Sequence, residues 1–244
     1  MTMLTADRFL KEAAGHQTEI LRDDGVYRHV RFQRPGTMCM HFDLITWPGY
    51  LCYTGDMGTY VFTRLRDMFD FFRRSYRENQ FNIDLHYWAE KVEAGDRRGC
   101  GNGVIEFSKA KFDTNVREWV EDFIKDEVGQ VDEADEAALL ACAMKDLRAA
   151  VEREVIGADD NDIRSFDAAR DFEFGASDSD AWSAFYGSDR TFDFGDFWEV
   201  DHDVFTHRFQ WCCFALAWGI KQYDDAKTAD ERDPRVPDMF EVAQ

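Results

Sequence analysis

Residues 17 to 63 alternate between short runs rich in β-branched and aromatic residues and short turn signals. This pattern constrains the fold more than any other feature of the chain. Asp24-Gly25, Pro48-Gly49 and Gly55-Asp56 are the turn signals that separate the runs. Consecutive strands joined by such short turns pair antiparallel. The pattern therefore predicts a five-stranded antiparallel meander, whose last three strands are expected at 38–46, 50–54 and 59–63.

The remainder of the chain is predicted to be mainly helical. A short helix with Thr5 as a cap opens the chain. The final helix is apolar almost all round, so it should be buried. Its return to the sheet would make the chain one compact unit with two subregions. The further helices are expected at 66–76, 82–95, 114–128, 133–157 and 204–223.

The fold class that follows is α+β: an N-terminal antiparallel β-sheet meander followed by a mainly helical C-terminal part packed on it. The length of 244 residues suits one large domain or two small ones. If the chain divides, the pattern places the sheet with its flanking helices in residues 1–110. The helical, strongly acidic region then occupies residues 111–244.

The net charge of −20 is unevenly distributed. Residues 1–75 hold 9 acidic residues and 10 Lys/Arg, whereas residues 159–203 hold 14 acidic residues and 3 Arg. The second segment alone therefore carries −11. Such a field repels nucleic acid and attracts cationic partners, including basic grooves that normally hold DNA or RNA. A solvated acidic face that only keeps the chain soluble is the alternative interpretation.

Cysteine usage and hydropathy point to a reducing, aqueous compartment. The six cysteines include no CxxC pair, and adjacent Cys212 and Cys213 have diverging side chains in a helix. No signal peptide is apparent at the start of the sequence. The apolar run 209–220 has twelve residues, too few to span a bilayer. We therefore expect a soluble, cytoplasmic protein without membrane contact.

The segment "DFGDFWEVDHDVFTH", residues 193–207, combines acidic, histidine and aromatic side chains. Its letters do not form a known kinase, calcium or zinc pattern. A strand would place Glu199, Asp201 and Asp203 on one face, whereas a helix would pair Asp203 with His207, so the ligands do not converge. Asp201 or Asp203 is better interpreted as a helix N-cap before Val204. No catalytic residue, metal site or cofactor is assigned.

Aromatic residues recur among the acidic residues of 159–203, and we expect them to anchor the backbone while the carboxylates project outward. DNA carries one charge per ~3.4 Å along each strand, a spacing that a folded display of carboxylates can approximate. The residues expected to contact a basic partner are Asp178, Asp180, Asp189, Asp193, Asp196, Glu199, Asp201 and Asp203.

Two segments resemble uncharacterised proteins encoded by bacteriophages and prophages. These are "FDLITWPGYLCYTGDMGTYVFTRLRDMFDFFRR", residues 42–74, and "FQWCCFALAWGIKQYDDAK", residues 209–227. The resemblance brings no established activity or site residue. It implies an accessory phage product in the cytoplasm of a bacterial host, where such products often counter CRISPR and restriction systems. Together with the charge, it predicts an inhibitor that binds a host nucleic-acid-binding or defence protein, such as a CRISPR effector, through an acidic, DNA-mimicking surface.

Two other functions stay open at this point. A metal- or carboxylate-dependent hydrolase would use a pocket that contains Asp56 with other carboxylates or histidines such as His41 or His86. A non-enzymatic adaptor or homo-oligomer would use basic residues of the sheet to contact the acidic region of another copy. Those basic residues are Arg28, His29, Arg31 and Arg34.

Overall fold

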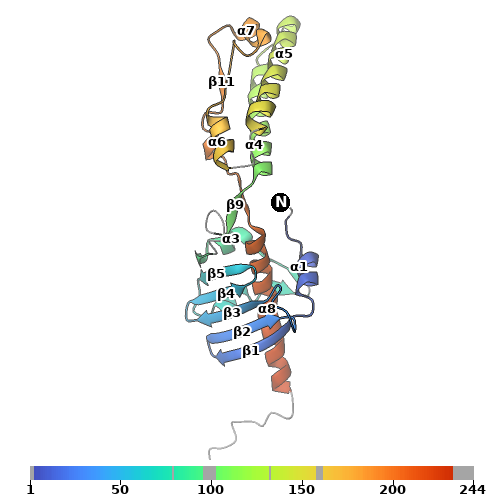
Figure 1. The fold of residues 1–244 in the computed structure, drawn as a ribbon, viewed down its shortest axis with the longest axis vertical. Helices are drawn as coiled ribbons and strands as arrows, with labels where there is room; N and C mark the ends of the chain where they lie inside the picture. Colours follow the sequence, from blue (N-terminus) through green and yellow to red (C-terminus); the bar gives the residue numbers. More distant parts are fainter. Residues whose placement is uncertain (1–2, 79, 96–102, 132, 158–161, 233–244) are drawn as a thin grey trace, which may run out of the picture. The chain divides into compact units, whose positions relative to one another are not determined.

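The structure is a computed structural model that describes residues 3–78, 80–95, 103–131, 133–157 and 162–232. The chain divides into two compact units (Figure 1). One, the sheet unit, consists of Thr2–Glu106 and Phe205–Gln244. The other, the helical unit, is Phe107–Val204. The helical unit ends at Val204 because the final helix belongs with the sheet and not with the helices before it.

The sheet unit confirms the predicted antiparallel meander. Its sheet has the strand order β1-β2-β3-β4-β5-β8, with every neighbouring pair antiparallel. The strands are β1 (Gln17–Asp24), β2 (Tyr27–Gln33), β3 (Phe42–Trp47), β4 (Tyr50–Gly55), β5 (Gly58–Thr63) and β8 (Val92–Ala94). A separate two-stranded ladder joins β6 (Tyr76–Arg77) and β7 (Gln80–Phe81).

The predicted helix over 82–95 is wrong in its second half. Helix α3 covers only Leu85–Ala89 and begins where the Asp84 side chain accepts a hydrogen bond from the Tyr87 amide at 2.9 Å. Residues 92–94 then form β8 and pair with β5. The pairing partner lies some thirty residues away in the chain, so local periodicity could not reveal it.

Three further helices belong to the sheet unit. Helix α1 (Ala6–Ala13) begins at the predicted cap, where the Thr5 hydroxyl accepts from the Arg8 amide. Helix α2 (Met68–Phe72) follows the meander and buries Met68, Phe69 and Phe72. Helix α8 (His207–Arg232) packs on the sheet and contributes Trp211, Cys212 and Leu216 to its core. Both adjacent cysteines are buried, and burial raises the pKa of each thiol.

Glycine allows α8 to lie close to the sheet. A Cβ atom on Gly219 would lie 3.1–3.2 Å from side-chain carbons of Phe32, Phe42 and Leu44. Those residues come from β2 and β3 and are fully buried. The apolar run 209–220 is therefore a buried core helix, as its composition predicted. None of the helices in the described parts of the chain has the length and apolar character needed to cross a membrane.

Helix α8 begins later than the sequence predicted, which changes the role of two aspartates. The Thr206 hydroxyl accepts from the Phe209 amide at 3.1 Å and caps the helix. Asp203 lies in the strand β12 (Asp203–Phe205), and the Asp201 carboxylate accepts from the Asp203 amide at 2.9 Å. The prediction that Asp201 or Asp203 caps the helix is thus wrong, because a short strand intervenes.

The helical unit is built on two long helices, as its sequence predicted. Helices α4 (Lys109–Val128) and α5 (Ala134–Val151) contact each other, and a π-helical turn (Glu152–Ile156) continues α5. The smaller elements are α6 (Asp162–Arg170), β10 (Glu173–Phe174), α7 (Asp180–Tyr186), β11 (Phe192–Asp193) and a 3-10 turn (Phe197–Glu199). Strand β9 (Ile105–Phe107) pairs with β12 where the chain passes from one unit to the other.

Candidate functional site

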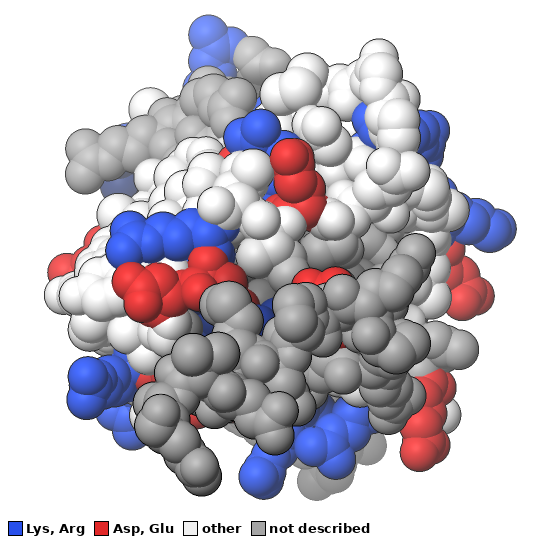
Figure 2. All heavy atoms as spheres, turned by 90° about the horizontal axis from the view of Figure 1, so that it is seen from below, with Lys and Arg blue, Asp and Glu red and all other residues white. Residues whose placement is uncertain are grey.

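Most of the negative charge lies in the helical unit. Residues 107–204 hold 27 acidic residues and 10 Lys/Arg, a net charge of −17 out of −20 for the whole chain. On the face that Figure 2 shows, basic and acidic side chains are interspersed. The helical unit is therefore the part of the chain whose charge can attract a basic partner.

Short helical turns and loops were expected in this region, but β10 and β11 form a paired ladder in which buried aromatics anchor the backbone and carboxylates project outward. Phe174 pairs with Phe192, and both are buried. One residue along, Glu173 pairs with Asp193 on the other face of the ladder, and both are exposed. Phe172 and Phe194 flank the pairs and are buried as well. The rings hold the two strands on the helices, so the carboxylates have a fixed backbone beneath them.

Seven of the eight predicted partner-binding residues are exposed, and Asp203 is half-buried. Three carboxylates also accept hydrogen bonds from nearby backbone amides: Asp178 from Gly175 at 2.9 Å, Asp193 from Gly195 at 2.8 Å, and Asp201 from Asp203 at 2.9 Å. These bonds restrict the direction of each carboxylate. A carboxylate held in this way is presented to a partner at less entropic cost than a free one.

The structure distributes the eight residues over the unit and does not gather them in one place. Asp178, Asp180 and Asp189 lie in or beside α7, whereas Asp193 ends β11 and Asp196 and Glu199 follow that strand. In Figure 1, α7 lies at one end of the helical unit and β11 leads away from it toward α6. The arrangement is a band of charge along the unit rather than a pocket of convergent ligands.

Asp201 and Asp203 contribute less to this band than the sequence predicted. The Lys111 ammonium of α4 contacts the Asp201 carboxylate at 2.8 Å and the Asp203 carbonyl at 2.9 Å. The hydrogen bond from Lys111 lowers the pKa of Asp201. Since its charge is already balanced by Lys111, Asp201 has less attraction left for an external cation.

His202 is a core residue rather than a ligand. Its ring is 4% exposed and lies among the rings of Phe112, Phe166 and Phe197, with centroid separations of 5.1, 5.2 and 4.8 Å. The Asn115 amide donates to Nδ1 at 3.0 Å, so the proton of the neutral ring resides on Nε2. Burial among apolar rings lowers the pKa of His202.

This lowered pKa predicts how His202 responds to acid. Since the unfolded chain titrates near the ordinary value of 6.5, protons bind the unfolded form first as the pH falls. Between pH 6.5 and the lower pKa of the folded form, each further pH unit of acidification should lower the free energy of unfolding by about 1.4 kcal/mol through His202. NMR titration of the imidazoles should give His202 a midpoint below 6.5. A midpoint at or above 6.5 would contradict the burial of an uncharged ring.

The three residues of the hydrolase alternative have structural roles. The Asp56 carboxylate accepts from the Met40 amide at 2.9 Å and the Asp56 amide donates to the His41 carbonyl at 3.0 Å, so Asp56 braces a turn. The His86 ring packs against Phe205 at 4.8 Å between centroids. Over the described ranges, no three His, Cys, Asp or Glu side chains are placed to share a metal ion.

The basic residues of the adaptor alternative are engaged within the sheet unit. Arg28 forms a two-pronged ion pair with Asp67, at 2.9 and 2.7 Å. His29 and Arg31 both contact Asp43. Arg34 donates to the Ala14 carbonyl at 3.0 Å. Burial raises the pKa of Asp43, but the bonds from Arg31 and His29 outweigh it and lower that pKa. Arg28, His29 and Arg31 are therefore engaged by carboxylates of the sheet unit itself, whereas Arg34 is held by a backbone carbonyl and keeps its net charge.

One pocket in the helical unit was not predicted from the sequence. It has a volume of about 530 Å³ and is lined by Phe166, Ala169, Arg170, Glu173, Asp193, Phe194, Gly195, Phe197 and Trp198. Asp193 is the only lining residue in the predicted set. A signal was nevertheless present, because "FEFG" at 172–175 and "FDFG" at 192–195 are near copies. They form the two strands that pair beside the pocket.

Comparison with known proteins gives no family model that matches the chain, and neither a curated protein nor a solved structure with significant similarity to it. The candidate site is therefore defined by its geometry and charge.

Proposed function

We propose that the protein is a phage-encoded accessory inhibitor that binds the nucleic-acid-binding surface of a host protein, such as a CRISPR effector or another defence protein, in the bacterial cytoplasm. The observation that carries the proposal is the concentration of −17 charges in the helical unit. The resemblance of residues 42–74 and 209–227 to phage and prophage proteins supports the setting.

The charge favours a basic protein surface over nucleic acid as the partner. A phosphate backbone would be repelled by the band of carboxylates, whereas a groove lined by Lys and Arg would be attracted to it over roughly a Debye length, about 8 Å at physiological salt. Attraction of this kind accelerates encounter and selects the partner. The exposed carboxylates stand on strands that buried phenylalanines anchor. Such a surface would keep its shape when it binds a basic groove in place of DNA.

The test uses three exposed acidic residues whose carboxylates accept no backbone hydrogen bond in the described structure, so that reversal spares the fold. Tagged protein carrying Asp180→Lys, Asp189→Lys and Asp196→Lys is used to capture proteins from a bacterial host lysate. The unaltered protein should retain a nucleic-acid-binding protein that added DNA displaces. The reversed variant should retain at least tenfold less of it.

A matched control reverses three exposed acidic residues of the sheet unit, Asp7, Glu78 and Glu93. This control changes the net charge by the same amount as the first variant. It should capture as much of the host protein as the unaltered protein does. Equal capture by both variants, or capture that neither salt nor DNA weakens, would contradict a charge-driven surface in the helical unit. Direct retention of nucleic acid without protein would contradict the choice of partner.

A further inference from the structure

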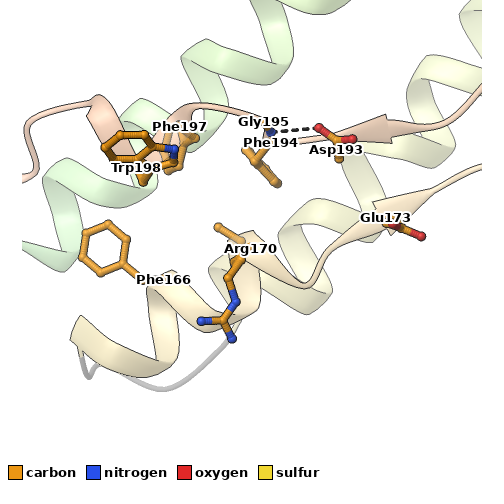
Figure 3. A pocket seen from close by; sticks show the side chains of 9 residues that line it. Phe166, Arg170, Glu173, Asp193, Phe194, Gly195, Phe197 and Trp198 are labelled. Carbon is orange, nitrogen blue, oxygen red and sulfur yellow. Dashed lines mark hydrogen bonds between the residues drawn. The ribbon is translucent and has the colours of Figure 1, made fainter.

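We propose that the pocket beside β10 and β11 receives an arginine side chain from the basic partner, and so forms the central contact of the acidic band. This inference rests on the proposed function, because it names one residue type of the partner and the place where it binds. Figure 3 shows the pocket with its labelled side chains. Its walls combine apolar rings with two acidic residues.

The floor of the pocket suits the aliphatic stem of a long side chain. Ala169, Phe194 and Phe197 are buried lining residues, each 2–3% exposed. At about 530 Å³, the pocket is within the 300–1,000 Å³ range typical of binding sites and has room for one such side chain with accompanying water. Apolar residues around a charged group of a partner are the usual surroundings of an energetic hot spot.

Within the described ranges, the two acidic residues of the wall have no basic side chain as an ion-pair partner. Glu173 and Asp193 lie directly opposite each other on paired strands, a placement that brings Cβ atoms to about 5 Å and makes like charges repel. Among the described residues, no lysine or arginine forms an ion pair with either. A guanidinium from outside would relieve this repulsion. An anion would increase it.

The arginine in the wall does not meet this need. Arg170 is the one basic lining residue, and its guanidinium contacts Asp167 at 2.8 Å and Asp171 at 2.9 Å. Its charge is therefore matched by two carboxylates outside the pocket lining. With Arg170 so paired, the field of the pocket is set by Glu173 and Asp193.

Trp198 favours arginine over lysine. Its side chain is 68% exposed although it lines the pocket, which is unusual for a residue with so much apolar area. A planar guanidinium stacks on an indole ring while the N–H groups at its edge donate to carboxylates. The ammonium of lysine is a compact charge that cannot stack in this way. In Figure 3, Trp198 and Phe197 lie on one side of the pocket and Phe166 faces them across the opening.

The experiment uses the full chain and two capped peptides, hexaarginine and hexalysine, with 5-fluorotryptophan as the reporter. The chain has seven tryptophans, so the signal of Trp198 is assigned as the one missing from Trp198→Phe. Hexaarginine should shift that signal and bind at least tenfold more tightly than hexalysine. Trp198→Ala should remove at least nine-tenths of the hexaarginine affinity, measured by calorimetry.

A second variant separates the pocket from general attraction. Glu173→Gln should weaken hexaarginine binding about tenfold, whereas Asp180→Asn, which removes the same charge from the first turn of α7, should weaken it less than threefold. Glu173→Gln should also raise the melting temperature, since it removes the repulsion with Asp193. A loss of binding that accompanied a lower melting temperature would mean damage to the fold and would overturn the assignment.

Two further outcomes overturn the arginine pocket. Equal affinities for the two peptides, or equal losses in Glu173→Gln and Asp180→Asn, would show that only the overall charge attracts cations. In that case the proposed inhibitor function survives, because its capture experiment depends on the band and not on the pocket. Conversely, selective arginine binding with no host protein captured would uphold the pocket and contradict the wider function.

Discussion

Replacing Gly55 by alanine should lower the free energy of unfolding of the sheet unit by about 3 kcal/mol, near the upper end for overpacking. Gly55 ends β4 and pairs with Phe42 of β3. A Cβ atom on Gly55 would lie 2.7 Å from Phe42 Cα and closer still to the His41 carbonyl oxygen. Both obstacles are backbone, so the strands themselves must separate. The same carbonyl accepts the Asp56 amide at 3.0 Å, and that bond would weaken too.

Gly25→Ala is the matched control for this result. Gly25 also lies at a hairpin turn, but a Cβ atom there would have no neighbour within 4 Å. Its φ of +59° adds only the cost of a left-handed conformation, about 1 kcal/mol. Denaturant unfolding of both variants compares the two effects. Gly55 itself has no positive φ, so equal losses would contradict the close approach of β3 and β4 as the reason for glycine at position 55.

Replacing Trp182 by alanine should cost about 4 kcal/mol in the helical unit. The ring is fully buried in α7, lies 5.2 Å from Phe174 and 4.7 Å from Tyr186 between centroids, and donates from Nε1 to the Arg190 carbonyl at 2.9 Å. Truncation removes these contacts and leaves that carbonyl without its partner. Hydrogen exchange of the α5 amides, which lie in the same core, measures the loss.

Trp198→Ala provides the comparison within the same unit. Because Trp198 is 68% exposed, its removal should change stability by less than about 0.5 kcal/mol. The two variants together distinguish a tryptophan that holds the fold from one that is available to a partner. A large loss of stability in Trp198→Ala would show that its exposed ring is needed for folding, which would contradict a binding role.

Local patterns were sufficient to predict much of the fold. The turn pairs between residues 24 and 56 and the alternation between them gave the meander, because hairpins form between neighbours in the chain. Helix α5 was predictable from its alanine and leucine content. Strand β8 and the start of α8 were not, since both depend on partners distant in sequence.

The candidate site was only partly predictable for a related reason. Composition identified the acidic band, and the aromatics interspersed among its acidic residues indicated carboxylates that project outward. Which charges are already neutralised depends on tertiary contacts, as Lys111 with Asp201 and Arg28 with Asp67 show. The pocket needed the pairing of β10 with β11, which brings residues twenty positions apart into one wall.

The order of the two units along the chain has a consequence for synthesis. The helical unit is one continuous segment, Phe107–Val204, whereas the core of the sheet unit combines strands before residue 63 with α8 after residue 207. A ribosome therefore releases all of the helical unit before the sheet receives its last helix. During that interval Phe32, Phe42 and Leu44 lack the surface of α8 that covers them in the finished protein. We expect the nascent sheet to be the stage at which the chain most needs a chaperone.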